Sequence, residues 1–253
     1  TLRSSCRENT RRTIARDVQR ASWSLTAAHG ENHRLCLNLQ NPLFPVHRRH
    51  HTVLRDVHDH RAQLVRNPKL LDLIDDALAP RPTEKSPRCV ITAGPTVEML
   101  DPVRILTNRS SGQMGFALAR AARAAGLRTT VISGPVSLPT PAGVERIDVV
   151  SAAEMRDQVL ALLPETDIFI GCAAVADFRP ATVSPQKIKK VKGTDELTLT
   201  LVKNPDIIAE VARSEQRPFT AGFAAETENL EAYAKRKLTE KNLDLIAAND
   251  VSK

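Results

Sequence analysis

Short apolar stretches alternate with amphipathic stretches from residue 88 to the end of the chain, and this alternation constrains the fold more than any other feature. Apolar runs predict strands at residues 89–93, 128–133, 146–150, 167–173, 197–202, 218–224 and 243–247. Helices are expected at residues 113–125, from an S-x-x-E capping box at Ser151 through Leu163, from Asn204-Pro205 onward, and near residues 229–238. Strands and helices in this order are typical of a parallel sheet covered on both faces. The sequence therefore predicts a doubly wound α/β domain with a mostly parallel, Rossmann-like sheet.

Residues 108–115 (N-R-S-S-G-Q-M-G) precede the first expected helix and have the character of a phosphate cradle. A turn of small residues at a helix N-terminus directs free backbone N–H groups and the positive end of the helix dipole toward an anion. Gly112 allows close backbone approach, and the hydroxyls of Ser110 and Ser111 could cap the helix or contact a phosphate oxygen. Taken alone, the pattern also fits a plain helix cap and tight turn. Gly126 is expected to end the helix in the left-handed conformation.

The first 70 residues differ in composition from the rest of the chain. They carry 12 Arg and one Lys against five acidic residues, whereas the remainder carries 23 basic and 24 acidic residues. All seven His lie between His29 and His60. Three interpretations stay open for this segment: electrostatic binding of nucleic acid, a metal site at H-R-R-H-H (47–51), and a poorly ordered or non-native segment such as an altered reading frame.

The chain is therefore expected to have three parts. Residues 1–70 form an unassigned basic Arg/His-rich segment, residues 71–87 hold a short amphipathic helix (70–78) and a Pro-rich linker (79–87), and residues 88–253 form the globular domain. Four cysteines without paired spacing, together with the lack of a signal peptide or long apolar run, predict a reduced, cytoplasmic protein with no membrane span.

Chemically distinctive segments follow the expected strands, at whose carboxyl ends such sheets bind their ligands. They are G-P-T at 94–96, G-C-A-A-V-A-D-F-R-P at 171–180, S-P-Q-K-I-K-K-V-K at 184–192, K-N-P-D at 203–206, G-F-A-A-E-T-E at 222–228 and K-N-L-D-L-I-A-A-N-D-V-S at 241–252.

Together with T-A-G-P-T (92–96), D-P-V-R (101–104) and S-G-P-V-S-L-P-T-P (133–141), these motifs resemble the phosphopantothenate-cysteine ligase domain of bacterial coenzyme A biosynthesis. The resemblance runs in unbroken order from about Cys89 to Lys253. It implies CTP-dependent activation of the 4'-phosphopantothenate carboxylate as an acyl-cytidylate, followed by attack of the cysteine amine and release of CMP. It also implies Mg²⁺. In the family a flavin-containing decarboxylase domain usually precedes the ligase domain, but residues 1–70 show no match to it, so FMN and decarboxylation are not carried over.

The resemblance implies two catalytic residues. Asn108 would donate its amide to the acyl-phosphate oxygens and to the oxyanion formed on cysteine attack, whereas an Asx-turn is its structural alternative. Lys187 would neutralise triphosphate charge, and Lys189, Lys190 and Lys192 are expected to sit in solvent. A lysine run is most often a solvated surface, yet a lysine loop also suits a lid over a triphosphate.

The implied nucleotide site draws on several segments. Besides Lys187, its members are Gly94, then Ser110, Ser111, Gly112 and Gly115 of the cradle, then Gly171, Cys172, Ala173 and Asp177, then Lys203, Asn204, Pro205 and Asp206, and finally Phe223, Lys237 and Lys241. For Asp177 the alternative is a turn acid paired with Arg179. For Cys172 a packed thiol is favoured over a nucleophile, since the mechanism needs none. No metal ligands are assigned.

Family members pair their ligase domains as dimers, so a homodimer or higher homo-oligomer is expected, with small-molecule substrates as the other partners. Two departures from the family pattern stand out. Val97 occupies a place where Arg is usual, and the chain stops at Lys253, where the family continues with further strands and a helix. The domain is thus expected to be incomplete at its C-terminal end.

Two other functions remain possible at this point. A Rossmann-type NAD(P)-binding oxidoreductase would suit the strand-turn-helix opening, but it predicts G-x-G-x-x-G and an acidic residue at the end of the second strand, where Ser133 and Gly134 stand instead. A non-catalytic nucleic-acid binder would use the Arg-rich segment, and it leaves the ordered lysine, Asn and Gly motifs without a role.

Overall fold

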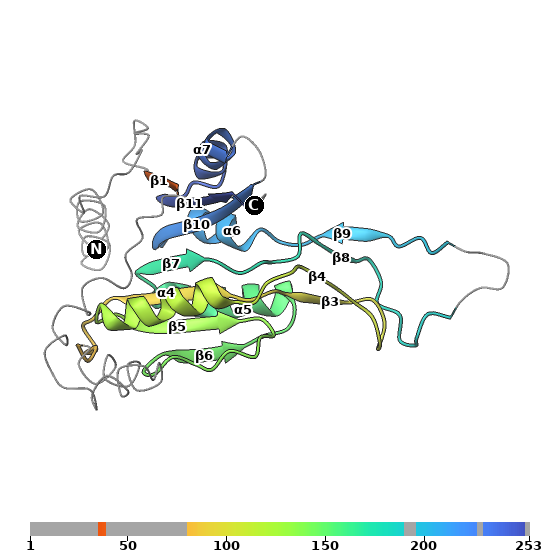
Figure 1. Ribbon diagram of the computed structural model, residues 1–253, viewed down its shortest axis with the longest axis horizontal. Coiled ribbons are helices and arrows are strands. Elements are labelled where there is room, and N and C mark those ends of the chain that lie inside the picture. Colours follow the sequence, from red (N-terminus) through yellow and green to blue (C-terminus); the bar gives the residue numbers. More distant parts are fainter. Residues whose placement is uncertain (1–34, 39–79, 190–195, 227–229, 251–253) are drawn as a thin grey trace, which may run out of the picture.

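The computed structural model describes residues 35–38, 80–189, 196–226 and 230–250, and these form a parallel sheet with helices on both faces (Figure 1). The strand order is β1-β11-β10-β7-β2-β5-β6, and every neighbouring pair is parallel. The strands are β1 (Leu35–Asn38), β2 (Arg88–Ala93), β5 (Arg128–Ser133), β6 (Glu145–Asp148), β7 (Ile168–Gly171), β10 (Phe219–Glu226) and β11 (Leu245–Asp250). The doubly wound, Rossmann-like fold is thereby confirmed.

Four helices cover this sheet in the described part of the chain: α4 (Gln113–Ala124), α5 (Ala152–Leu162), α6 (Ile207–Arg213) and α7 (Leu230–Glu240), with a 3₁₀ turn η1 (Leu163–Glu165) after α5. Strand β2 is buried on both faces of the sheet. Its successive side chains point in opposite directions, so they enter two different clusters. Ile91 packs in one cluster with Phe116 of α4, whereas Val90 packs in another with Met155 of α5 and Val211 of α6. This explains why β2 is a continuous apolar run rather than an alternating one.

Local signals place the helix ends close to where the sequence predicts them. Ser151 is the N-cap of α5, and its hydroxyl accepts a hydrogen bond of 3.2 Å from the Glu154 N–H, while the Glu154 carboxylate accepts one of 2.9 Å from the Val150 N–H. Helix α4 ends in a Schellman motif, in which Gly126 has φ +83° and the Leu127 N–H donates to the Ala122 carbonyl.

Two short antiparallel hairpins project past the carboxyl ends of the sheet (Figure 1). One pairs β3 (Val97–Met99) with β4 (Ile105–Thr107), and the other pairs β8 (Phe178–Pro180) with β9 (Leu201–Lys203). We call residues 97–107, 178–189 and 196–203 the arm. The strand expected at residues 197–202 is thus reduced to β9, and it lies in the arm instead of the main sheet.

Two further details differ from the sequence expectations. Helix α6 begins at Ile207 and not at Asn204-Pro205, because Asp206 is the N-cap and its carboxylate accepts from the Ala209 N–H. Strand β1 comes from the N-terminal segment, for which no strand was expected. The helix expected at residues 70–78 and the H-R-R-H-H segment lie outside the described residues. None of the described helices is both long and apolar enough to cross a lipid bilayer.

Candidate functional site

Two threonines join the loops that follow β2 and β7 at the carboxyl edge of the sheet. The hydroxyl of Thr92 accepts hydrogen bonds from the N–H groups of Cys172 (3.2 Å) and Ala173 (3.3 Å), and the hydroxyl of Thr96 accepts one of 2.8 Å from Ala176. Both threonines are buried. These N–H groups are therefore already paired, and residues 171–173 offer a bound molecule chiefly their carbonyl groups and small side chains. Sequence reasoning missed Thr92 and Thr96, although T-A-G-P-T holds both.

The cradle forms the start of α4, and its N-cap is Gly112 in the left-handed conformation, with φ +76°. No side chain of the described residues caps this helix, so the first-turn N–H groups are not used by a cap. Ser110 instead accepts from the Gly112 N–H at 3.3 Å, and the idea that a serine hydroxyl caps the helix is wrong. A Cβ at Gly115 would lie 2.5 Å from the Ala93 Cβ, so only glycine lets α4 approach β2 this closely.

Asn108 connects the cradle to the loop after β7. Its side-chain amide nitrogen donates to the carbonyl oxygens of Val175 (2.9 Å) and Ala174 (3.5 Å). The side chain is exposed and points across to a loop 66 or 67 residues away, so it does not form an Asx-turn of its own. Asn108 thus stands where the cradle and the 172–176 segment meet.

The K-N-P-D segment divides into inward and outward residues. Asn204 is 5% exposed, and its amide nitrogen donates to the Ala176 carbonyl (2.9 Å) and to Glu98 Oε1 (3.3 Å), while its oxygen accepts from Arg179 (3.0 Å). Lys203 and Pro205 are exposed. Asn204 therefore holds the segment in place by its side chain rather than offering it to a ligand.

Glu98 is a second buried polar residue that sequence reasoning missed. It is 6% exposed, and its Oε1 accepts from the N–H of Ala152, the first residue of α5, at 2.9 Å as well as from Asn204. A carboxylate at a helix N-terminus is stabilised by the helix dipole. Glu98 thus links the arm to α5 and to the K-N-P-D segment.

Contacts bring Asp177, Asp206 and Lys241 into the same region. The Asp177 carbonyl accepts from the Asn204 N–H at 2.8 Å, and Asp206 forms an ion pair of 2.9 Å with Lys241. The ion pairs of the described residues include none between Asp177 and Arg179, so the alternative assigned to Asp177 is wrong. Lys237 lies on α7, one turn before Lys241, which directly follows the helix, and Lys237 is half-buried.

Gly171 and Gly222 lie side by side on β7 and β10. A Cβ at either position would lie 2.8 Å from the Cδ1 atom of Ile208, whose side chain rests over both. Phe223 follows directly and is half-buried. The two glycines thus make room for Ile208 of α6.

Lys187 lies apart from this group. Its neighbours in sequence contact the turn of the β3–β4 hairpin: the Ser184 N–H donates to the Leu100 carbonyl at 3.0 Å, and the Ile188 N–H donates to Asp101 at 3.0 Å. Lys187 itself is exposed, as is Lys189, while Lys190 and Lys192 lie outside the described residues. We call residues 184–189 the lysine loop. It therefore belongs to the arm and not to the ends of the sheet strands.

Cys172 has the properties of a packed thiol. Burial raises its pKa to about 11, so the thiolate is scarce at neutral pH. Among the described residues, no three His, Cys, Asp or Glu side chains are grouped so that they could hold a metal ion together.

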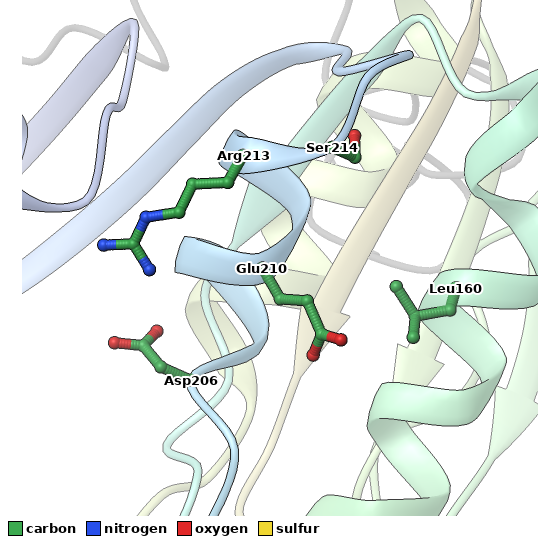
Figure 2. A pocket seen from close by; sticks show the side chains of 5 residues that line it. All are labelled: Leu160, Asp206, Glu210, Arg213 and Ser214. Carbon is green, nitrogen blue, oxygen red and sulfur yellow. The ribbon is translucent and has the colours of Figure 1, made fainter.

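Two open grooves lie near these segments. One of about 550 Å³ runs between α5 and α6 and is lined by Leu160, Asp206, Glu210, Arg213 and Ser214, so it shares only Asp206 with the expected site (Figure 2). The other, of about 510 Å³, lies at the ends of β5 and β6 and is lined by residues 135–137, Arg146 and residues 148–150. Val136 of this second groove also lies against the cradle: a Cβ at Gly112 would be only 3.0 Å from the Val136 Cγ1 atom.

The sheet and the loops at its carboxyl edge define a doubly wound α/β protein of the kind that binds ligands at this edge. The chain belongs to the family described as the DNA/pantothenate metabolism flavoprotein C-terminal domain, whose model matches residues 85–253. The resemblance found in the sequence is thereby confirmed.

Individual relatives agree with this assignment. The coenzyme A biosynthesis bifunctional protein CoaBC of Vibrio vulnificus (strain YJ016) is 57% identical over 185 residues, which are 73% of this chain and 46% of that protein. The crystal structure of the C-terminal domain of CoaBC matches with a TM-score of 0.56 and 38% identity, over 64% of this chain and 76% of that one. A Cab2 mutant in complex with phosphopantothenate-cysteine has a TM-score of 0.57 at 17% identity, over 76% and 80% of the two chains, and shares the fold. The chain spans about half the length of the curated relatives it matches.

Proposed function

We propose that this protein joins 4'-phosphopantothenate to cysteine in a CTP-dependent reaction of coenzyme A biosynthesis, with an acyl-cytidylate as the intermediate. The family assignment supports it, and the contact of Asn108 with the loop after β7 is the structural observation that carries it. Through this contact an amide donor, the uncapped start of α4 and the small-residue loop meet at one edge of the sheet. Charge that develops on an acyl phosphate needs such donors.

In the first step, the carboxylate of phosphopantothenate attacks the α-phosphate of CTP and pyrophosphate leaves. The uncapped N–H groups at the start of α4 suit phosphate oxygens, because the helix dipole also favours negative charge there. Lys187 would offset triphosphate charge from the arm. Mg²⁺ would arrive on the triphosphate, whose oxygens supply most of the ligands that this ion prefers.

In the second step, the cysteine amine attacks the activated carbonyl and CMP leaves. The Asn108 amide nitrogen donates to two carbonyl oxygens in the structure, and the oxygens of the acyl-cytidylate are acceptors of the same kind. An oxyanion is a stronger acceptor than a carbonyl, so a hydrogen bond from Asn108 to the substrate oxygen would strengthen in the transition state.

The cytidine site is proposed to use the residues that the sequence assigns to it. The backbone of Gly171, Cys172 and Ala173 would line the base, and Asp177, Lys203 and Phe223 would surround it. Lys237 and Lys241 would reach phosphates, which requires Lys241 to exchange its ion pair with Asp206 for the nucleotide. Asn204 acts on this site through its buried cross-links, and Pro205 shapes the turn before α6.

A homodimer is proposed from the surface of the arm. Among the described residues, nine of the eleven exposed large apolar side chains lie on the arm: Met99, Val103, Ile105, Phe178, Val183, Leu197, Leu199, Leu201 and Val202. Apolar side chains concentrated on one projection indicate a surface that a partner covers. A second copy is the occupant that fits the family. Residues 88–253 would form the ligase-like domain, the role of residues 1–70 stays open, and the protein would act in the cytoplasm.

One incubation tests this function. The protein is mixed with phosphopantothenate, cysteine, Mg²⁺ and either CTP or ATP, and the products are followed by chromatography. We expect CMP, pyrophosphate and phosphopantothenoylcysteine with CTP, and much slower turnover with ATP. Equal turnover with ATP would refute the cytidine preference, and no product with either nucleotide would refute the ligase function. Hydride transfer from a nicotinamide cofactor instead would support the oxidoreductase alternative, although Ser133 at the end of β5 offers no carboxylate for a ribose hydroxyl.

A further inference from the structure

Asp101 is a fully buried acidic residue in an otherwise exposed turn. Its side chain has no solvent exposure, whereas Pro102 and Val103 beside it are exposed. A buried carboxylate is costly unless hydrogen bonds and opposite charge compensate for the loss of water. The partners of Asp101 therefore indicate what the residue is for.

The two carboxylate oxygens of Asp101 serve different segments. Oδ1 accepts from the N–H groups of Val103 and Arg104, both at 2.8 Å, and these contacts close the hairpin turn locally. Oδ2 accepts from the N–H of Ile188 at 3.0 Å, a residue 87 positions away, and lies 3.6 Å from the Arg104 guanidinium. The turn itself needs only Oδ1, so the contact of Oδ2 serves the lysine loop.

Arg104 completes the hold on the same residue. Its guanidinium donates to the Ile188 carbonyl at 2.8 Å, so both backbone polar groups of Ile188 are bound by the hairpin. Burial disfavours the charged carboxylate, but the N–H groups of Ile188, Val103 and Arg104 and the Arg104 charge together lower the pKa of Asp101 below its usual value. Asp101 is thus an anion throughout the physiological range.

We infer that Asp101 is a positioning residue that fixes the backbone next to Lys187, so that the hairpin and the lysine loop move as one body and Lys187 meets the triphosphate in a set place. The inference rests on the proposed function for the role of Lys187. Asp101 touches no substrate in this scheme. It acts through the Ile188 backbone, one residue from the lysine.

The substitution Asp101→Asn tests the hold directly. It keeps the shape of the side chain and the oxygen that closes the turn, but it places an NH₂ group opposite the Ile188 N–H and the Arg104 guanidinium, where donor then faces donor. We expect the Ile188 amide to exchange hydrogen at least about tenfold faster, while amides of β2 keep the parent rate. Asp244→Asn is the matched control, because Asp244 also accepts a backbone N–H, from Thr220 at 2.8 Å, and pairs with Arg217.

A double-mutant cycle tests whether Asp101 acts through Lys187. Pyrophosphate release is measured for the parent, Asp101→Asn, Lys187→Gln and the double variant. A misplaced group can cost up to about a hundredfold, so Asp101→Asn alone should slow release by about tenfold to a hundredfold. When Lys187 is already replaced by Gln, Asp101→Asn should slow pyrophosphate release by no more than about a further twofold. Ile188→Pro, which removes the N–H from the loop side and leaves Asp101 in place, should reproduce the slow release even if Asp101→Asn folds poorly.

The outcomes separate this inference from the proposed function. If the parent releases no pyrophosphate from CTP, the proposed function fails and the inference fails with it. If the parent is active but the two substitutions act independently, or if Ile188 exchanges at the parent rate in Asp101→Asn, Asp101 only stabilises its turn and the inference alone is overturned. The Asp244→Asn control should leave the hydrogen exchange of the Ile188 amide and the rate of pyrophosphate release unchanged.

Discussion

At the scale of single residues, the direction of each side chain decides which residues can act on a ligand. The sequence indicates that Asn108 and Asn204 both belong to the site, since each lies in a motif of the family. In the structure Asn108 is exposed at the edge of the cradle, whereas Asn204 is buried against Glu98 and Ala176. The three partners of the Asn204 side chain lie 25, 28 and 106 residues away, so no local pattern could have revealed its role.

Asn108→Asp should separate the two chemical steps. The carboxylate cannot donate to the Val175 carbonyl or to an oxyanion, and it adds a negative charge beside the acyl-cytidylate and the oxyanion formed from it. We expect measurable CTP binding, because the α4 N-terminus still offers its N–H groups, while the cysteine-dependent step slows by about a hundredfold to a thousandfold. Rapid mixing followed by mass spectrometry would detect the acyl-cytidylate before cysteine is added. Product formation at the parent rate would leave Asn108 with no catalytic part.

Lys187→Gln should slow the first step. It keeps a polar side chain that is only one atom shorter but removes the charge that offsets the triphosphate, so pyrophosphate release should fall by about a hundredfold. Lys189→Gln is the control, because Lys189 lies in the same loop, is equally exposed and is expected to be solvated. Equal effects of the two substitutions on pyrophosphate release would show that the loop acts only through its overall charge.

At the scale of secondary structure, the sequence predicts the elements whose burial is periodic. Strand β5 matches the expected range, and β2 and α4 differ from theirs by one residue, because apolar runs and capping signals mark their ends. The strands β3, β4, β8 and β9 have three residues each; β4, β8 and β9 are largely exposed, whereas β3 exposes only Met99. Residues 197–202 predict a strand, of which β9 keeps only the end, and the other three strands have no expected counterpart in the sequence. All four pair with each other and not with the main sheet, so the pairing and position of the arm could not be predicted from local sequence.

Thr92→Val should weaken the link between β2 and the loop after β7. Valine has the same shape but cannot accept a hydrogen bond, so the N–H groups of Cys172 and Ala173 lose their acceptor. The free energy of unfolding should fall by about 1–3 kcal/mol, as expected for buried donors left without a partner. Urea unfolding measures the change. Thr129→Val is the control: its hydroxyl donates only to the Leu127 carbonyl, so a smaller loss is expected. Equal losses would show that Thr92 is an ordinary buried threonine.

At the scale of the whole molecule, the arm and the sheet differ in how their surfaces are covered. Helices cover both faces of the sheet, whereas the arm exposes Val103 (63%), Ile105 (48%) and Phe178 (48%). A single chain leaves this apolar surface in water, which is unfavourable. The lysine loop is part of the same arm, so the proposed dimer would bury a surface next to a proposed catalytic residue.

Ile105→Lys should therefore convert the proposed dimer into monomers. A charge in the apolar centre of an interface loses its water without gaining a partner, which raises the dissociation constant. Sedimentation velocity would follow the change over a range of concentrations, with circular dichroism to verify the fold. Val150→Lys is the control, because Val150 is similarly exposed at 45% but lies outside the arm. Dimers that persist in Ile105→Lys, or that dissociate equally in both variants, would exclude the arm as the interface.

The contact of Ile208 with Gly171 and Gly222 has a genetic consequence. An alanine at Gly171 would place its Cβ 2.8 Å from the Cδ1 atom of Ile208, so the Ile208 side chain on α6 would have to move. We expect an alanine scan to record weaker nucleotide binding and to suggest a lost contact at Gly171, although the cause would be the displaced Ile208 side chain. Ile208→Val removes the Cδ1 atom and so makes room for the Cβ of an alanine at position 171. The three positions thus form a suppressor set, in which a defect at a glycine on the strand is repaired by a smaller side chain on the helix.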